Sequence, residues 1–203
     1  MITQTKATQD QLTPEAALAM LVDGNSRFVE NSNTSRELLE QVDQTSAGQF
    51  PFAVIHSCID SRVPAELVFD QGIGDIFSTR VAGNIINEDV LGSIEYGCKV
   101  AGSKVVLILG HSKCGAVTAA CRGVELGNIT PLLEKIKPSV AKVQPAADEI
   151  SSEEIERVAA LNVQYSIDLI RSNSTILKEM EDEKSILIVG GIYDVATGKV
   201  DLI

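Results

Sequence analysis

The sequence predicts an α/β protein built around a mostly parallel sheet with helices on both faces. Short apolar runs that do not alternate with polar residues recur along the chain, and helical patterns lie between them. Such runs are typical of strands buried on both faces, and strands that alternate with helices are typical of a parallel sheet. At 203 residues, with no repeat or linker, the chain is expected to form one domain, residues 1–203.

Residues 1–48 are expected to form a helical arm that precedes an α/β core, residues 49–203. Thr13 can cap a helix, and Pro14 fits its first turn. A shorter helix is expected over 35–42. The first helix carries one apolar stripe, which consists of Leu18, Leu21, Val22, Phe28 and Val29. Because this arm lies outside the predicted core, we expect a second subunit to cover the stripe in a homodimer, which can pair into a homotetramer.

Four apolar runs predict the strands of the core, at 52–55, 76–79, 105–109 and 186–189. Helical patterns cover 88–101, 115–125, 131–143 and 152–171. Ser151 and Glu154 form a capping-box pattern at the start of the last helix. Thr197-Gly198 predicts a turn before an edge strand. Binding sites in such sheets lie at the carboxyl ends of the strands, so the residues after each run are the candidates for function.

Composition excludes several classes of partner. The formal net charge of −11 disfavours nucleic acid and anionic membrane surfaces, which repel an acidic protein. No run approaches the roughly 18 apolar residues of a membrane-spanning helix. The first residues lack the basic and apolar stretches of a secretory signal, and 4 cysteines are too few for a disulfide scaffold. We therefore expect a cytoplasmic protein.

Two predicted strands are followed by side chains that suit a metal. Cys58 comes just after the first strand, and His111 and Cys114 come just after the third. Neighbouring parallel strands would bring these residues together. Two thiolates and an imidazole suit Zn²⁺, and three protein ligands leave one position open for water or substrate, as in a catalytic site.

Asp60 and Arg62 lie on the same loop as Cys58. Alternate residues of a loop can point the same way, so Asp60 can lie beside the metal while Arg62 pairs with it. Arg62 would keep Asp60 ionised and oriented. Asp60 could then accept a hydrogen bond from a zinc-bound hydroxide and orient it for attack on a substrate.

Several segments resemble motifs of the β-class carbonic anhydrases. They are Cys-Ile-Asp-Ser-Arg-Val-Pro-Ala-Glu at 58–66, Arg-Val-Ala-Gly-Asn at 80–84, Ser-Ile-Glu-Tyr at 93–96 and Gly-His-Ser-Lys-Cys-Gly at 110–115. The similarity is detailed from about Gln49 to Gly115 and looser towards the C-terminus. It implies a zinc lyase that interconverts carbon dioxide and bicarbonate.

The resemblance also implies roles for individual residues. Cys58, His111 and Cys114 correspond to the zinc ligands of the family, and Asp60 and Arg62 to its catalytic pair. A second set corresponds to substrate-binding positions or to the surroundings of the active-site cleft, and it consists of Gln49, Phe77, Tyr96 and Gly115. In this family the N-terminal helices embrace a second protomer, and the clefts lie at that interface.

Two other interpretations stay open. The same scaffold can hydrolyse a related heteroallene such as carbon disulfide. Alternatively, the Cys/His site is purely structural in a binding module, with Asp60 as its fourth ligand. Three further residues are expected to be structural: Cys98 and Cys121 as buried thiols on helix faces, and His56 as a hydrogen-bonded histidine.

Overall fold

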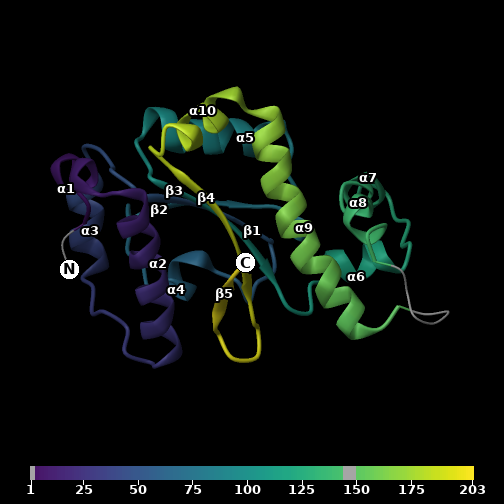
Figure 1. Cartoon of the computed structure of the whole chain (residues 1–203). Helices are drawn as coiled ribbons and strands as arrows, with labels where there is room; N and C mark the ends of the chain where they lie inside the picture. Colours follow the sequence, from purple (N-terminus) through teal and green to yellow (C-terminus); the bar gives the residue numbers. More distant parts are fainter. Residues whose placement is uncertain (1–2, 144–149) are drawn as a thin grey trace.

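The computed structural model describes residues 3–143 and 150–203 and confirms an α/β fold around one five-stranded sheet (Figure 1). Among these residues, no helix is long and apolar enough to cross a membrane. In chain order the helices and strands are α1 (Lys6–Gln11), α2 (Pro14–Val29), α3 (Leu38–Thr45), β1 (Ala53–Ser57), α4 (Ala65–Val68), β2 (Ile76–Arg80), a 3₁₀ turn (Ala82–Asn84), α5 (Glu88–Glu95), a π-helical segment (Tyr96–Val100), β3 (Val105–His111), α6 (Gly115–Cys121), α7 (Ile129–Glu134), α8 (Lys137–Val140), α9 (Ser152–Asn173), α10 (Thr175–Asp182), β4 (Leu187–Tyr193) and β5 (Val200–Leu202).

The sheet has the strand order β2-β1-β3-β4-β5. The first four strands are parallel, and β5 pairs antiparallel with β4 as the predicted edge strand. Successive strand residues point to opposite faces. Because every residue of β1 and β3 is buried, both faces of the sheet are covered at these strands. Ile55 and Leu107 belong to the cluster that packs under α2 and α4, whereas Val54 and Ile108 belong to the cluster under α5, α9 and α10 (Figure 1). Both faces of the sheet are therefore covered, as its unalternating strands predict.

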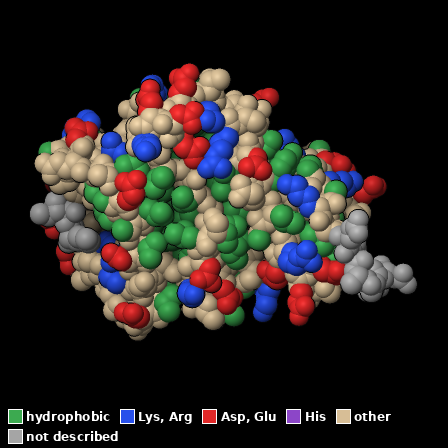
Figure 2. Space-filling view, viewed as in Figure 1, with side chains coloured by type: hydrophobic (Ala, Val, Ile, Leu, Met, Phe, Trp, Pro, Cys, Tyr) green, Lys and Arg blue, Asp and Glu red, His purple; other side chains and the backbone are tan. Residues whose placement is uncertain are grey.

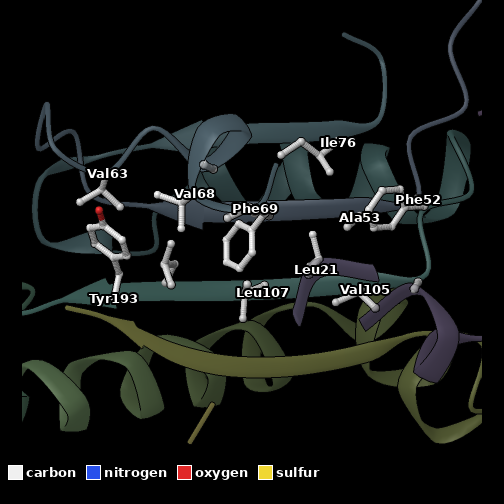
Figure 3. Close-up of a cluster of buried hydrophobic side chains, with 14 residues drawn as sticks. Leu21, Phe52, Ala53, Val63, Val68, Phe69, Ile76, Val105, Leu107 and Tyr193 are labelled. Atoms are coloured by element: carbon white, nitrogen blue, oxygen red, sulfur yellow. The ribbon is translucent and has the colours of Figure 1, made fainter. Parts of the chain in front are cut away.

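The N-terminal arm does not lie outside the core, which corrects the prediction from its apolar stripe. Leu21 is 1% exposed and packs with Phe52, Phe69 and Leu107 of the same chain (Figure 3). Leu18 and Phe28 are partly buried against the same cluster. Of the stripe, only Val22 and Val29 are largely exposed, at 43% and 46%. A second subunit is therefore not needed to cover most of this helix.

A glycine allows α2 to approach this closely. A Cβ atom added at Gly24 would lie 1.9 Å from the carbonyl oxygen of Phe69, which follows α4. Thr13 caps the helix as predicted, because its side chain accepts a hydrogen bond from the backbone N–H of Ala16. The local sequence thus sets both where α2 begins and how closely it packs.

Other helices differ from the predictions for local reasons. The helix expected over 131–143 is split into α7 and α8. Pro138 has no N–H to donate to the carbonyl of Glu134, so a continuous helix would lose a hydrogen bond there. The helix expected over 35–42 runs instead over Leu38–Thr45, and Arg36 before it pairs with Asp70 and donates to the carbonyl of Thr34. Helices α1 and α4 are short and were not predicted.

Asp70 ties the connection between α2 and α3 to the core. Its side chain is 2% exposed and pairs with Arg36 and with Arg27, the latter at 2.6 Å. The backbone N–H and the hydroxyl of Thr34 also donate to it. Burial by itself would raise the pKa of Asp70, but the two guanidinium groups outweigh it and lower that pKa. The ionised form is therefore favoured in the folded chain.

We expect Asp70→Asn to lower the free energy of unfolding by about 3 kcal/mol, because it leaves two arginines around an uncharged group. Since the pKa of Asp70 is lowered on folding, the wild-type advantage is full above the unfolded aspartate pKa of about 4 and shrinks as pH falls below it. Urea denaturation at several pH values measures this difference. Asp23→Asn, at an exposed position on α2, is the control. Equal stability of both variants at neutral pH would contradict the assignment.

Candidate functional site

Three side chains that could bind a metal meet at the carboxyl ends of β1 and β3. Cys58 follows the last residue of β1, His111 ends β3, and Cys114 caps the start of α6. Ser57 lies opposite Leu109 in the parallel register, so the segments after the two strands are neighbours. The three ligand atoms lie within 4.8 Å of one another, and all three residues are buried. The strand-end argument from the sequence selects the same three residues.

The protonation of His111 suits a metal ligand. Its Nδ1 lies 2.9 Å from the carbonyl oxygen of Ser112, which can only accept, so Nδ1 donates there and Nε2 of the neutral ring, the form that binds metals, carries a lone pair. Within the described part of the chain, this buried Nε2 has no hydrogen-bond partner. A buried nitrogen without a partner beside two thiols is an unsatisfied group that a metal ion would satisfy. The residues present therefore fit a metal.

The two cysteines have different acidities. The thiol of Cys114 lies beside that of Cys58 and lowers the pKa of Cys58. The backbone N–H of Gly83, 3.3 Å from the Sγ of Cys58, contributes to the same effect. The closeness of Cys58 raises the pKa of Cys114, and burial adds to this. The cluster thus stabilises a thiolate at Cys58, the form in which cysteine binds metals.

Asp60 and Arg62 form a two-point ion pair next to this cluster. Nε of Arg62 lies 2.9 Å from Oδ1 of Asp60, and Nη2 lies 2.7 Å from Oδ2. The backbone N–H of Arg62 also donates to Oδ1. Oδ2 is 3.9 Å from Nε2 of His111, which places the carboxylate beside the candidate ligands. The guanidinium of Arg62 holds the pKa of Asp60 well below its usual range, so the carboxylate is charged at neutral pH.

Arg80 holds the loop that carries Cys58 and Asp60. It extends from the end of β2 and donates to the carbonyl of Cys58 at 3.0 Å and to the carbonyl of Asp60 at 2.5 Å. The sequence places Arg80 inside a recognisable motif but gives it no role. Its contacts identify it as a group that fixes the spacing between a candidate ligand and the candidate catalytic carboxylate.

Helix α9 holds a second loop against the cluster. Asn162 is 1% exposed and donates to the carbonyl of Gly83 at 2.8 Å. Gly83 has φ of 67°, a conformation that favours glycine, and its N–H faces Cys58. Ser166 donates to the carbonyl of Asn84 at 3.0 Å. The sequence alone gives none of these residues a role, although a polar Asn162 on an apolar helix face is a signal of a specific contact.

The segment between His111 and Cys114 is held from two sides. The hydroxyl of Ser112 donates to Asp194 at 3.2 Å and accepts from the N–H of Val195 at 3.0 Å, so the turn after β4 fixes the carbonyl that orients His111. On the other side, Glu156 of α9 accepts a hydrogen bond from the N–H of Lys113 at 2.8 Å. Nothing in the sequence pattern marks Asp194 or Glu156 for this role.

The expected substrate-binding residues lie in two places. Gly115 follows Cys114 at the start of α6. Gln49, Phe77 and Tyr96 line a separate hollow, where the two rings meet edge to face at 6.2 Å between centroids. Phe77 lies opposite Val54, four residues before Cys58, which is about 13 Å along the strand. Within one chain, the structure therefore does not bring these three residues to the metal cluster.

The residues expected to be structural behave largely as predicted. His56 is buried and hydrogen-bonded to Thr79 at 2.9 Å and to the carbonyl of Ile85 at 3.0 Å. Burial lowers the pKa of His56, which favours the neutral ring. Cys98 is 1% exposed, whereas Cys121 is only partly buried.

Known proteins share this fold and sequence. The family model for carbonic anhydrase matches residues 53–200. The chain is 36% identical over 197 residues to carbonic anhydrase 2 of Mycobacterium tuberculosis, covering 93% of this chain and 92% of that protein. The chain belongs to the β-class carbonic anhydrase family.

Solved structures of β-carbonic anhydrases agree with the fold. One from Aspergillus fumigatus is 26% identical and superposes with a TM-score of 0.73 over 93% of this chain and 89% of the other. A tetrameric β-carbonic anhydrase from Sordaria macrospora, at 22% identity, gives 0.70 over 81% and 89%. The resemblance seen in the motifs is thus confirmed, and the chain is an enzyme of this family.

Proposed function

We propose that this carbonic anhydrase catalyses the reversible hydration of carbon dioxide to bicarbonate and a proton, with one zinc ion held by Cys58, His111 and Cys114. The observation that carries the proposal is the buried Cys-His-Cys cluster beside the Asp60–Arg62 ion pair. Two thiolates and an imidazole match the ligands that zinc prefers. Three protein ligands leave one position for water or substrate.

When bound, zinc supplies the Lewis acidity that deprotonates a water molecule near neutral pH. The chain's own residues orient the reacting oxygen. Asp60, kept ionised by Arg62, is an acceptor only, so it would accept a hydrogen bond from the O–H of the reacting oxygen and orient a lone pair of that oxygen towards carbon dioxide. Arg80 and Arg62 hold the loop and the carboxylate in place.

The geometry favours catalysis over a closed structural site. Both carboxylate oxygens of Asp60 are engaged by Arg62, and Nη2 of Arg62 also lies 3.3 Å from the carbonyl of Lys113. For Asp60 to become a fourth ligand, these charge-assisted hydrogen bonds would have to break.

The free cysteines Cys58, Cys98, Cys114 and Cys121 suit a reducing compartment, and we propose a cytoplasmic location for the enzyme.

We further propose that the enzyme works as a dimer, which can pair into a tetramer, and that Gln49, Phe77 and Tyr96 complete the substrate cleft of a neighbouring protomer. These residues lie away from the metal cluster of their own chain, and Tyr96 is 54% exposed.

A second surface also suits self-association. Figure 2 shows hydrophobic side chains across the middle of one face, where Figure 1 places β5 and the C-terminus between α2 and α9. A groove of about 260 Å³ there is lined by Val22, Val29 and Leu202 among others. Apolar surface of this kind is typical of self-association.

We expect Cys114→Ser to lose zinc and activity together, because serine is a poor ligand for this metal and only two ligands remain. Metal analysis of the purified protein, paired with a hydration assay, measures both. Cys121→Ser removes the thiol at the other end of α6 and should keep about one zinc per chain. Full zinc occupancy in Cys114→Ser would mean that the ligand set is wrong.

We expect Asp60→Asn to keep zinc and to lower turnover by at least about 100-fold, because the amide can donate where a pure acceptor is required. Wild-type activity should rise from neutral to alkaline pH. This rise is not a titration of Asp60, whose pKa is held far lower. Stopped-flow hydration assays across pH measure both effects, and Asp182→Asn, on the exposed end of α10, is the control. Near-normal turnover in Asp60→Asn would leave the carboxylate as a structural partner of Arg62.

A mixing experiment tests whether the cleft is shared. We expect Asp60→Asn and Gln49→Ala to be weakly active alone and to regain up to about a quarter of wild-type activity when their protomers are exchanged, because a mixed dimer has one intact site. Sedimentation at micromolar concentration verifies assembly. A stable, active monomer, or the absence of any recovery between exchanged protomers, would contradict the shared site.

A further inference from the structure

Lys113 adopts an unfavourable backbone conformation between two candidate metal ligands. Its φ is 55°, in the left-handed region, which residues other than glycine rarely adopt. The residue lies between His111 and Cys114, so its backbone angles set the direction in which the chain enters α6. A relaxed Lys113 would therefore move Cys114 relative to His111.

Both backbone groups of Lys113 have partners outside the loop. Its N–H donates to Oε1 of Glu156 at 2.8 Å, and its carbonyl accepts from Nη2 of Arg62 at 3.3 Å. One residue thus links a helix of the second half of the chain to the cation that orients Asp60. Of these two contacts, only the one with Glu156 comes from outside the Asp60–Arg62 ion pair.

Glu156 sits on a firmly anchored helix. Its neighbour Ile155 and the next turn, Val158 and Ala159, belong to the same buried cluster as Cys58 and Cys114. The capping box of Ser151 and Glu154 fixes where α9 begins. A carboxylate held by this helix can therefore restrain the backbone of Lys113, one residue before the candidate ligand Cys114.

We propose that Glu156 is a positioning residue of the metal site, which holds Lys113 in the left-handed conformation and so aligns Cys114 with Cys58 and His111. The inference rests on the proposed zinc site. Lys113 is exposed, so water can replace Glu156 as the acceptor for its N–H. Water, however, does not hold the N–H of Lys113 in one fixed direction, as Glu156 does. The role of Glu156 is therefore conformational, and it should depend on the residue at position 113.

This dependence gives a test that a merely stabilising role would fail. Zinc affinity is measured by competition with a chelator, and the absorption spectrum of the Co²⁺-substituted protein reports the geometry of the ligands. We expect Glu156→Ala to bind zinc about tenfold more weakly, since removal of supporting groups around a metal typically costs 10- to 100-fold. Glu156→Gln should stay within about threefold of wild type, because its amide oxygen can still accept.

Lys113→Gly provides the decisive comparison. Glycine adopts the left-handed conformation without strain, so the restraint from Glu156 becomes unnecessary. We expect the double variant Glu156→Ala, Lys113→Gly to bind zinc within about threefold of Lys113→Gly alone. Glu153→Ala, which removes a carboxylate from the same hollow beside Lys113, should leave zinc affinity unchanged.

Three results would overturn the inference: unchanged zinc affinity in Glu156→Ala, an equal loss in Glu153→Ala, or an equal loss with glycine at position 113. A fall in melting temperature without a change in affinity would likewise reduce Glu156 to a stabilising residue. Wild-type protein that binds no zinc would instead refute the proposed function. Wild-type protein that binds zinc and hydrates carbon dioxide, alongside an unaffected Glu156→Ala, would refute only this inference.

Discussion

The register between β1 and β3 is the constraint on which the rest of the site depends. Ser57 lies opposite Leu109, and this pairing sets Cys58 beside the end of β3, where His111 and Cys114 follow. A slip of one residue would move His111 by about 3.3 Å and turn its side chain to the other face. Such a slip would also exchange the buried sets of both faces, for example Leu107 and Ile108. The apolar packing of the sheet thus fixes the geometry of the polar site.

The second support of the site is α9. Its apolar residues contact two of the three buried clusters, which gives the helix one position on the sheet. From that position Asn162 and Ser166 hold the loop at Gly83 and Asn84, and Glu156 holds Lys113. Asn162 and Ser166 are buried, where polar groups are costly unless they are paired, and each donates to one backbone carbonyl. Residues far along the sequence therefore orient loops that carry the chemistry.

The sequence could predict what depends on local pattern. Unalternating apolar runs located the strands, and their ends located Cys58 and His111. Pattern alone could not show that Leu21 packs on its own sheet, because a stripe on a helix does not say which surface covers it. Nor could it assign Arg80 or Glu156, since a charged residue reads as solvated until the structure supplies its partner. The break near Pro138, by contrast, is one that the sequence could predict, because proline cannot donate the hydrogen bond of a helix interior.

The exposure of the ion pair bears on how the site works. In a single chain the side chain of Arg62 is 47% exposed and that of Asp60 is 18% exposed. Water screens a pair of this kind, so the pair contributes less energy than it would if it were covered. A surface that covered the pair would lower the local dielectric, strengthen the interaction and exclude competing water from a small apolar substrate. The hollow of Gln49, Phe77 and Tyr96 offers two aromatic rings and an amide, and it does not cover the ion pair of its own chain. If two protomers assembled with this hollow over the ion pair of the neighbour, the contact would strengthen the pair and exclude water from the substrate.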